Sequence, residues 1–128
     1  MNSNKEFNKL FSIGAFFIFL SIVLGAFGAH LLKDILSKYY LEVYEKAVFY
    51  QVTQSLGILI LGLCFKVTEK QYYKYAIYIL TLGIIIFCGS LYLLTLTKIK
   101  IFGAITPIGG TLMIIAWGFL LFKLIREK

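Results

Sequence analysis

Four long stretches of this chain contain no Asp, Glu, Lys or Arg, and they limit its fold more than any other feature. They cover residues 10–29, 47–65, 75–97 and 101–122. About 18 uncharged, mainly apolar residues suffice for a helix to cross a bilayer. Only 15% of the chain is charged and its mean hydropathy is +0.88, whereas a soluble domain is about a quarter charged. The sequence predicts an all-α integral membrane bundle of four transmembrane helices in a single domain, residues 1–128.

The connection between the first two spans, residues 31–46, is amphipathic. Its apolar residues recur at helical spacing. Its charges alternate in sign at intervals of four residues, which predicts ion pairs along one helix face; they belong to Asp34, Lys38, Glu42 and Lys46. One interpretation is a separate helix lying in the membrane interface. The other is a short turn followed by a helix that Ser37 caps and that continues directly into the second span.

The basic residues lie in short clusters at the ends of the spans. Eight Lys and Arg residues belong to the N-terminus, the C-terminus and the connection 66–74, whereas five belong to the connections 31–46 and 98–100. This bias predicts a multi-pass protein of the cell membrane with both termini in the cytoplasm and residues 31–46 outside. Basic clusters at span ends are suited to anionic lipid headgroups, so membrane lipids, and not nucleic acids, are the expected partners.

Small residues mark the faces where helices are expected to pack. Ser21, Gly25 and Ala29 are spaced four apart and share one helix face. The sequence Thr106-Pro107 contains the only proline of the chain, which should kink the fourth span or restart it, with Thr106 as N-cap and residues 101–105 as a separate lead-in. The expected packing positions are Ser21, Gly25, Gly28, Ala29, Gly89, Pro107, Gly109 and Gly110.

Polar residues collect at one depth, in the halves of the spans that face away from the cytoplasm in this topology. The candidate cluster is His30, Gln51, Gln54, Ser90, Tyr92 and Thr106. We expect His30 and Gln54 to point toward the same space, together with Tyr92 or Thr106, and Gln51 to face inward. A hydrogen-bonded network that fixes helix register, at about 0.6 kcal/mol per bond, is the interpretation we favour. A polar pocket that opens outward is the alternative.

The residue inventory predicts neither an enzyme nor a metal or cofactor site. His30 is the only histidine, and Cys64 and Cys88 lack the spacing of a metal or redox pair. Ser90 with His30 could form a nucleophile and base, but no carboxylate lies within a span to orient the imidazole. We therefore expect no catalytic residues, no metal and no cofactor.

Several motifs, in their order along the chain, carry a resemblance to a known family. They are Gly25-Ala26-Phe27-Gly28-Ala29-His30, the segment from Ala47 to Tyr50-Gln51, Gly89-Ser90-Leu91-Tyr92 and Thr106-Pro107-Ile108-Gly109-Gly110 followed by Trp117. Together they resemble the YwdK/YgdD type of small, uncharacterised, multi-pass bacterial membrane proteins. The resemblance covers nearly the whole chain and implies a four-helix membrane protein with no assigned reaction.

The expected function is that of a non-enzymatic membrane component. It would bind a lipid, a membrane-protein partner or a second copy of itself through grooves beside its small residues. The alternative is a carrier or pore for a small solute that enters through the polar cluster. The two differ in one respect, because a carrier needs a water-accessible cavity that passes Gln54. The sequence does not identify the ligand, partner, oligomeric state or physiological process.

Overall fold

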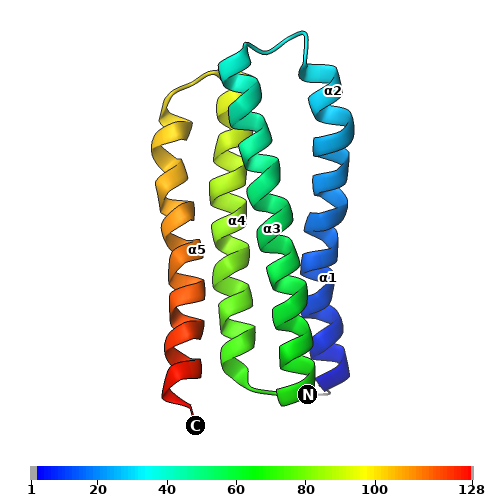
Figure 1. Ribbon diagram of the computed structural model, residues 1–128, viewed down its shortest axis with the longest axis vertical. Coiled ribbons are helices and arrows are strands. Elements are labelled where there is room, and N and C mark those ends of the chain that lie inside the picture. Colours follow the sequence, from blue (N-terminus) through cyan, green and yellow to red (C-terminus); the bar gives the residue numbers. More distant parts are fainter. Residues whose placement is uncertain (1–2, 128) are drawn as a thin grey trace.

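The computed structural model describes residues 3–127 and is helical apart from short connections. The elements in chain order are α1 (Ser3–Ile22), the π-helix η1 (Val23–Gly28), α2 (Ala29–Leu32), α3 (Lys38–Thr68), α4 (Gln71–Thr97) and α5 (Ile101–Arg126). The first three elements form one continuous rod, so the fold consists of four long rods (Figure 1). All four are long and apolar enough to cross a membrane. The expected all-α membrane fold with four spans is confirmed.

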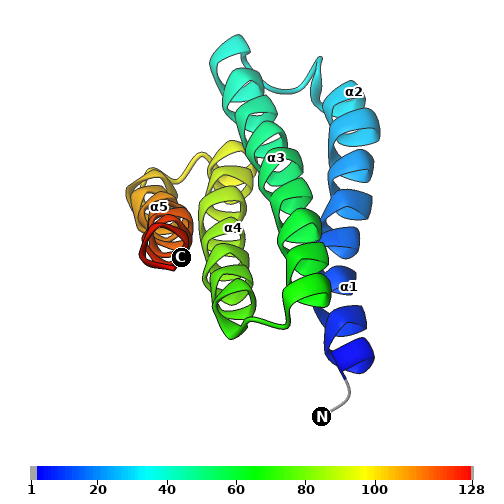
Figure 2. The same ribbon diagram turned by 60° about the horizontal axis from the view of Figure 1, so that its bottom comes forward.

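The four rods pack in the spatial order α1, α3, α4, α5 (Figures 1 and 2). The two middle rods form most of the core, around buried side chains such as Ile58, Ile77, Leu80 and Ile84. Within residues 3–127, the backbone of α5 approaches only that of α4, and α1 approaches mainly α3. The four rods therefore form an open row and not a closed ring. In this row, part of the surface of α3 and of α4 is not covered by another rod.

The connection after the first rod is a turn, and α3 begins immediately after Ser37. The backbone of Ser37 is extended, and its hydroxyl accepts a hydrogen bond from the Tyr40 amide at 3.3 Å. This residue is therefore the N-cap, and the second interpretation of residues 31–46 is correct. With 31 residues, α3 is about 46 Å long and exceeds a hydrocarbon core of about 30 Å. Its amphipathic first turns extend the second span toward the interface.

The ion pairs expected along residues 34–46 are not formed. Asp34 lies in the turn and not on the helix, which removes it from the face of α3. Among the described residues, the ion pairs join Lys74 to Glu6 at 3.4 Å and Lys70 to Glu127. Both connect rods at the end of the bundle where the termini lie. The hydrogen bond from Lys70 lowers the pKa of the Glu127 carboxyl.

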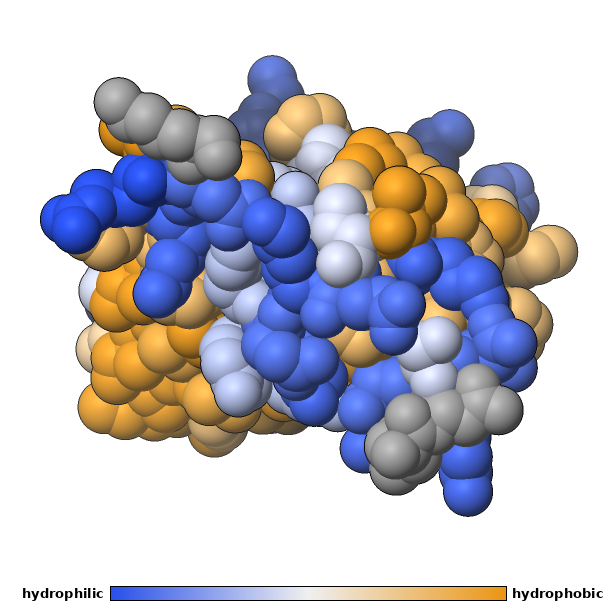
Figure 3. Space-filling model, turned by 90° about the horizontal axis from the view of Figure 1, so that it is seen from below, coloured by the Kyte–Doolittle hydropathy of each residue, from blue (hydrophilic) through white to orange (hydrophobic). Residues whose placement is uncertain are grey.

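Two tight links make α3, α4 and α5 antiparallel in succession. Glu69 and Lys98 each end a helix in the left-handed conformation, with φ of 58° and 59°. Their amides bond the carbonyls of Phe65 and Leu94, both at 2.7 Å. As a result, both chain ends lie at the end of the bundle that carries the α3–α4 link (Figure 1). Seen from this end, hydrophilic residues form a band across the bundle, with apolar surface at its sides (Figure 3).

The fourth rod is continuous through its proline. Helix α5 begins at Ile101, so Pro107 lies inside it, and the expected restart at Thr106 with a separate lead-in is wrong. The proline costs one helical hydrogen bond. The surroundings hold the helix in register, because the Thr106 hydroxyl contacts that of Ser90 on α4 at 2.6 Å.

Glycines set the close approach of α4 and α5. A Cβ at Gly109 would overlap the backbone of Phe87, and one at Gly83 would lie 3.0 Å from the Gly109 carbonyl oxygen. A Cβ at Gly110 would lie 3.5 Å from the Phe87 ring. Gly109 and Gly110 therefore pack as expected, and Gly83 is a further packing position that was not predicted from the sequence.

The remaining expected packing positions divide into two groups. On the first rod, Ser21 is buried, and a Cβ at Gly25 would lie 3.0 Å from Val48 of α3. Ala29 on the same face is half-buried. By contrast, Gly89 has no atom within 4 Å of the position of its missing Cβ, and Pro107 is exposed. The expectation that these last two lie at helix contacts is wrong.

Candidate functional site

Gln51 joins three rods at one buried point. Its side chain is 2% exposed. Its amide nitrogen donates to the Phe17 carbonyl of α1 at 3.0 Å, and its amide oxygen accepts from the Tyr92 hydroxyl of α4 at 2.7 Å. The Ser21 hydroxyl donates to the same Phe17 carbonyl at 2.6 Å. Gln51 therefore faces inward, as expected, and is held from both sides as an amide in hydrocarbon must be.

The π-helix η1 provides a second link between the first rod and α3. The Leu24 carbonyl accepts the Ala29 amide five residues later, and it also accepts the Tyr44 hydroxyl at 2.6 Å. Gly28 lies directly against that hydroxyl, because a Cβ there would overlap it. The widened turn and the glycine together let a phenol from α3 reach the backbone of the first rod.

Apart from Tyr92, the predicted polar residues do not join Gln51 in one cluster. Ser90 and Thr106 pair with each other between α4 and α5. His30 is exposed on α2 and lines neither of the hollows described below. Its imidazole forms no hydrogen bond or ion pair with the described residues. The structure therefore does not bring His30 together with Gln54, because His30 lies at the end of the first rod, beyond the level of the bonded polar pairs.

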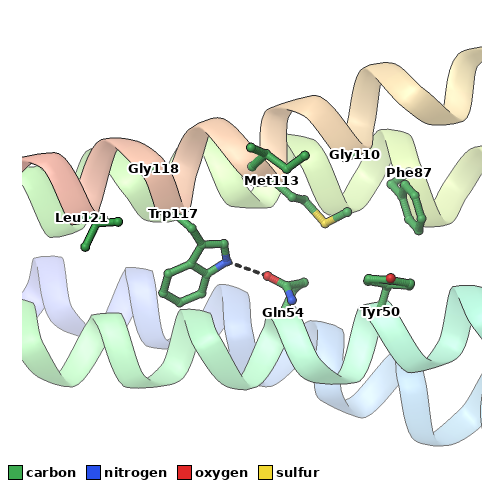
Figure 4. A pocket seen from close by; sticks show the side chains of 9 residues that line it. Tyr50, Gln54, Phe87, Gly110, Met113, Trp117, Gly118 and Leu121 are labelled. Carbon is green, nitrogen blue, oxygen red and sulfur yellow. Dashed lines mark hydrogen bonds between the residues drawn. The ribbon is translucent and has the colours of Figure 1, made fainter.

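Gln54 faces a groove between α3 and α5. The groove has a volume of about 550 Å³ and crosses the side of α4 that the open row leaves uncovered. The residues that line it are Tyr50, Gln54, Phe87, Gly110, Met113, Ile114, Trp117, Gly118 and Leu121 (Figure 4). All of these except Gln54 are apolar, aromatic or glycine, so the groove is suited to an apolar occupant.

A single side chain spans this groove. The Trp117 indole N–H donates to the Gln54 amide oxygen at 2.7 Å (Figure 4). The indole also occupies the space beside Gly57 on α3, where a Cβ would lie 2.7 Å from it. Trp117 therefore links α5 to α3 although their backbones do not approach. Trp117 was not among the predicted site residues; the available signal was a glycine three residues after an intramembrane glutamine.

A smaller hollow of about 200 Å³ lies between the first rod and α4, beside Gln51. Its lining includes Cys88, Gly89 and Tyr92, with aliphatic residues of both rods. Both hollows offer apolar walls with one or two amide or phenol groups. Within residues 3–127, no three His, Cys, Asp or Glu side chains lie together as a metal-ligating set.

Comparison with known proteins places the chain among membrane proteins without an assigned activity. Residues 24–110 match the family described as "Protein of unknown function (DUF423)". The chain is 49% identical over 110 residues to a UPF0382 membrane protein of Staphylococcus haemolyticus, which covers 85% of this chain and 89% of the relative. It is 47% identical to a UPF0382 membrane protein of Staphylococcus epidermidis, with the same coverage. One from Staphylococcus saprophyticus is 46% identical, covering 85% and 91%. No solved structure matches significantly.

Proposed function

This chain belongs to the DUF423 family of membrane proteins of unknown function, and from that premise we propose that it is a non-enzymatic protein that binds a membrane lipid in the α3–α5 groove. The observation that carries the proposal is the groove itself. It is apolar, it lies along helices that are long enough to cross a membrane, and it opens on the side of α4 that no other rod covers. An occupant would therefore enter sideways from the bilayer.

The residues that line the groove on α3, α4 and α5 leave room for an occupant of this kind. Gly118 leaves open space, because nothing lies within 4 Å of the position of its missing Cβ. Among the described residues, the Trp117–Gln54 bond is the hydrogen bond between α3 and α5, and the backbones of these two helices do not approach each other, so the groove can widen without separating two closely packed backbones. A volume of about 550 Å³ is within the range of about 300–1,000 Å³ that is typical of small-molecule sites.

Native mass spectrometry of the protein extracted with its lipids tests this proposal. We expect the wild-type protein to retain a bound lipid and Gly118→Leu to lose it, because the Cβ has open space at this position and the rest of the new side chain occupies the groove. Gly89→Leu is the matched control. It places the same side chain at an equally open glycine that lines the smaller hollow, and it should retain the lipid. Equal retention by both variants would refute a site in the α3–α5 groove.

A carrier or pore for a polar solute is less well supported by this geometry. Its path would have to pass Gln54, whose groove is lined almost entirely by apolar groups. The other buried amide, Gln51, is occupied on both sides by Phe17 and Tyr92. Solute uptake into vesicles by the purified protein, abolished by Gln54→Leu, would favour the carrier instead.

We propose that both termini lie in the cytoplasm and that the α1–α3 connection lies outside, in the cell membrane. The support is the excess of Lys and Arg at the end of the bundle that carries the termini, eight against five. Single cysteines at positions 37 and 68, in a background without Cys64 and Cys88, test it with a membrane-impermeant thiol reagent on intact cells. Labelling of position 37 alone is expected, and labelling of position 68 alone would invert the orientation.

A further inference from the structure

We infer that the occupant of the α3–α5 groove is an uncharged planar ring compound of the quinone class, which presents a carbonyl oxygen to the Gln54 amide. The inference rests on the proposed function and specifies its ligand. It follows from three properties of the groove: the depth of Gln54 in the membrane, the unused hydrogen-bonding capacity of its amide, and the aromatic groups beside it.

The depth of Gln54 excludes the carbonyl groups of ordinary phospholipids. On α3 the charged residues nearest to it are Lys46 and Lys66. They are about 30 Å apart along the helix axis, which equals the thickness of the hydrocarbon core. Gln54 is about 12 Å from the first and about 18 Å from the second, so it lies about 3 Å from the midplane. Phospholipid ester groups lie at the boundary of the core. An acceptor at the depth of Gln54 must therefore belong to a molecule whose polar group enters the hydrocarbon.

The amide of Gln54 has a donor to offer at this depth. Its oxygen accepts the Trp117 indole, which turns the amide nitrogen away from Trp117 (Figure 4). That nitrogen carries two N–H groups. One contacts the Thr53 hydroxyl at the long distance of 3.4 Å, and no second acceptor lies among the described residues. Since no water is available in hydrocarbon, a carbonyl oxygen from the occupant would satisfy the remaining N–H.

The side chains around this donor favour a flat, uncharged ring. Tyr50, Phe87 and Trp117 line the groove on both sides of Gln54 (Figure 4). The rings of Tyr50 and Phe87 are 5.0 Å apart and inclined at 65°, which leaves ring faces and edges on the groove. No charged residue lines it, so neither a carboxylate nor an ammonium group of a ligand would find a partner.

The fluorescence of Trp117 tests the inference directly, because it is the only tryptophan of the chain. The protein in lipid nanodiscs is titrated with 2-methyl-1,4-naphthoquinone, a ring that quenches tryptophan. We expect saturable quenching in the wild-type protein. Gln54→Leu should weaken the apparent affinity about three- to tenfold, the value of one neutral hydrogen bond. Gly118→Leu should abolish the saturable component, and Gly89→Leu should bind as the wild-type protein does.

Competition with 2-methylnaphthalene separates failure of this inference from failure of the proposed function. This ring has the same shape but no carbonyl, and we expect it to relieve the quenching with an affinity about three- to tenfold lower than the affinity of the quinone itself. Equal affinities of the two rings would overturn carbonyl recognition and leave an apolar lipid groove. Unsaturable quenching that Gly118→Leu does not alter would overturn the groove itself. The competition uses the wild-type protein, so it decides the matter even if Gln54→Leu fails to fold.

Discussion

Replacing Gly109 by Ala should destabilise the bundle, although alanine is the better helix former. Gly109 is buried where α5 crosses the backbone of Phe87. The added Cβ would lie 2.7 Å from the Phe87 Cα and 2.8 Å from its Cβ, and closer still to its amide nitrogen. Nonbonded carbons prefer about 3.5–4.0 Å. The two helices must therefore separate by about 1 Å, because backbone atoms cannot turn aside as a flexible side chain can.

The expected loss follows from where α5 is held. Among residues 3–127 its backbone approaches only α4, and the close contacts around Gly83 and Met113 lie at the same crossing. Separation there loosens the whole attachment of α5. Overpacking of this kind costs about 1–3 kcal/mol, from which the higher helix propensity of alanine recovers about 0.5–1 kcal/mol. The middle of the two ranges gives a net destabilisation of about 1 kcal/mol.

Two matched substitutions give the control. Gly118→Ala and Gly89→Ala lie on α5 and α4 at positions where a Cβ meets nothing within 4 Å, so both should be neutral or stabilising by up to about 1 kcal/mol. Equilibrium unfolding in mixed detergent, followed by circular dichroism, measures all three variants. If Gly109→Ala proves as stable as the two controls, the α4–α5 contact is not set by the missing side chain, and the packing argument is wrong.

Three further predictions follow from the polar contacts. Gly28→Ala should lower the melting temperature of the protein, because the new methyl group overlaps the Tyr44 hydroxyl. Adding Tyr44→Phe should partly restore the melting temperature of that variant, although Tyr44→Phe by itself lowers the melting temperature of the wild-type protein. Tyr92→Phe should lower the free energy of unfolding by about 0.6–1.7 kcal/mol, measured by equilibrium unfolding. In a Gln51→Leu background the same change should have almost no effect, since the Tyr92 hydroxyl bonds the Gln51 amide. If the losses of the two single variants add up in the double variant, the bond is contradicted. The hydrogen-bonded ion pair with Lys70 lowers the pKa of the Glu127 carboxyl below its ordinary 4.5. The stabilisation that this pair adds to the fold is therefore present above pH 4.5 and is lost as the pH falls through the lowered pKa. The melting temperatures of wild type and Glu127→Gln should therefore converge between about pH 6 and about pH 3.

The fold was predictable because hydropathy alone decides which segments cross a membrane. All four uncharged stretches lie within the first rod (α1, η1 and α2) and helices α3, α4 and α5, since hydrocarbon leaves the backbone no alternative to internal hydrogen bonds. The start of α3 was ambiguous for a specific reason. The apolar pattern of residues 38–46 is the same whether the helix lies in the interface or stands at its edge, and only the extended backbone of Ser37 distinguishes the two.

The directions of the polar side chains were harder to predict. In a soluble bundle an apolar stripe identifies the inner face of each helix, but in a membrane both faces are apolar and the stripe disappears. Gln51 and Gln54 are one helical turn apart and look equivalent in the sequence. The first meets two partners inside the bundle, and the second meets Trp117 across a groove. That difference depends on the spatial order of the rods, which places α5 beside α4 and not beside α3.

This difference also shifts the functional hypothesis from the histidine to the second glutamine. His30 is the only histidine and is the polar group that a sequence reader would choose first, yet it lies exposed on α2 away from both hollows. Gln51 has its amide groups engaged within the protein and serves to hold three rods together. Gln54 alone combines a depth near the membrane centre, a groove open to the bilayer and an N–H that the described residues leave without an acceptor. In hydrocarbon such a donor gains from any molecule that brings an acceptor to it, and for this reason a ligand, if it comes from the bilayer, should be recognised at Gln54.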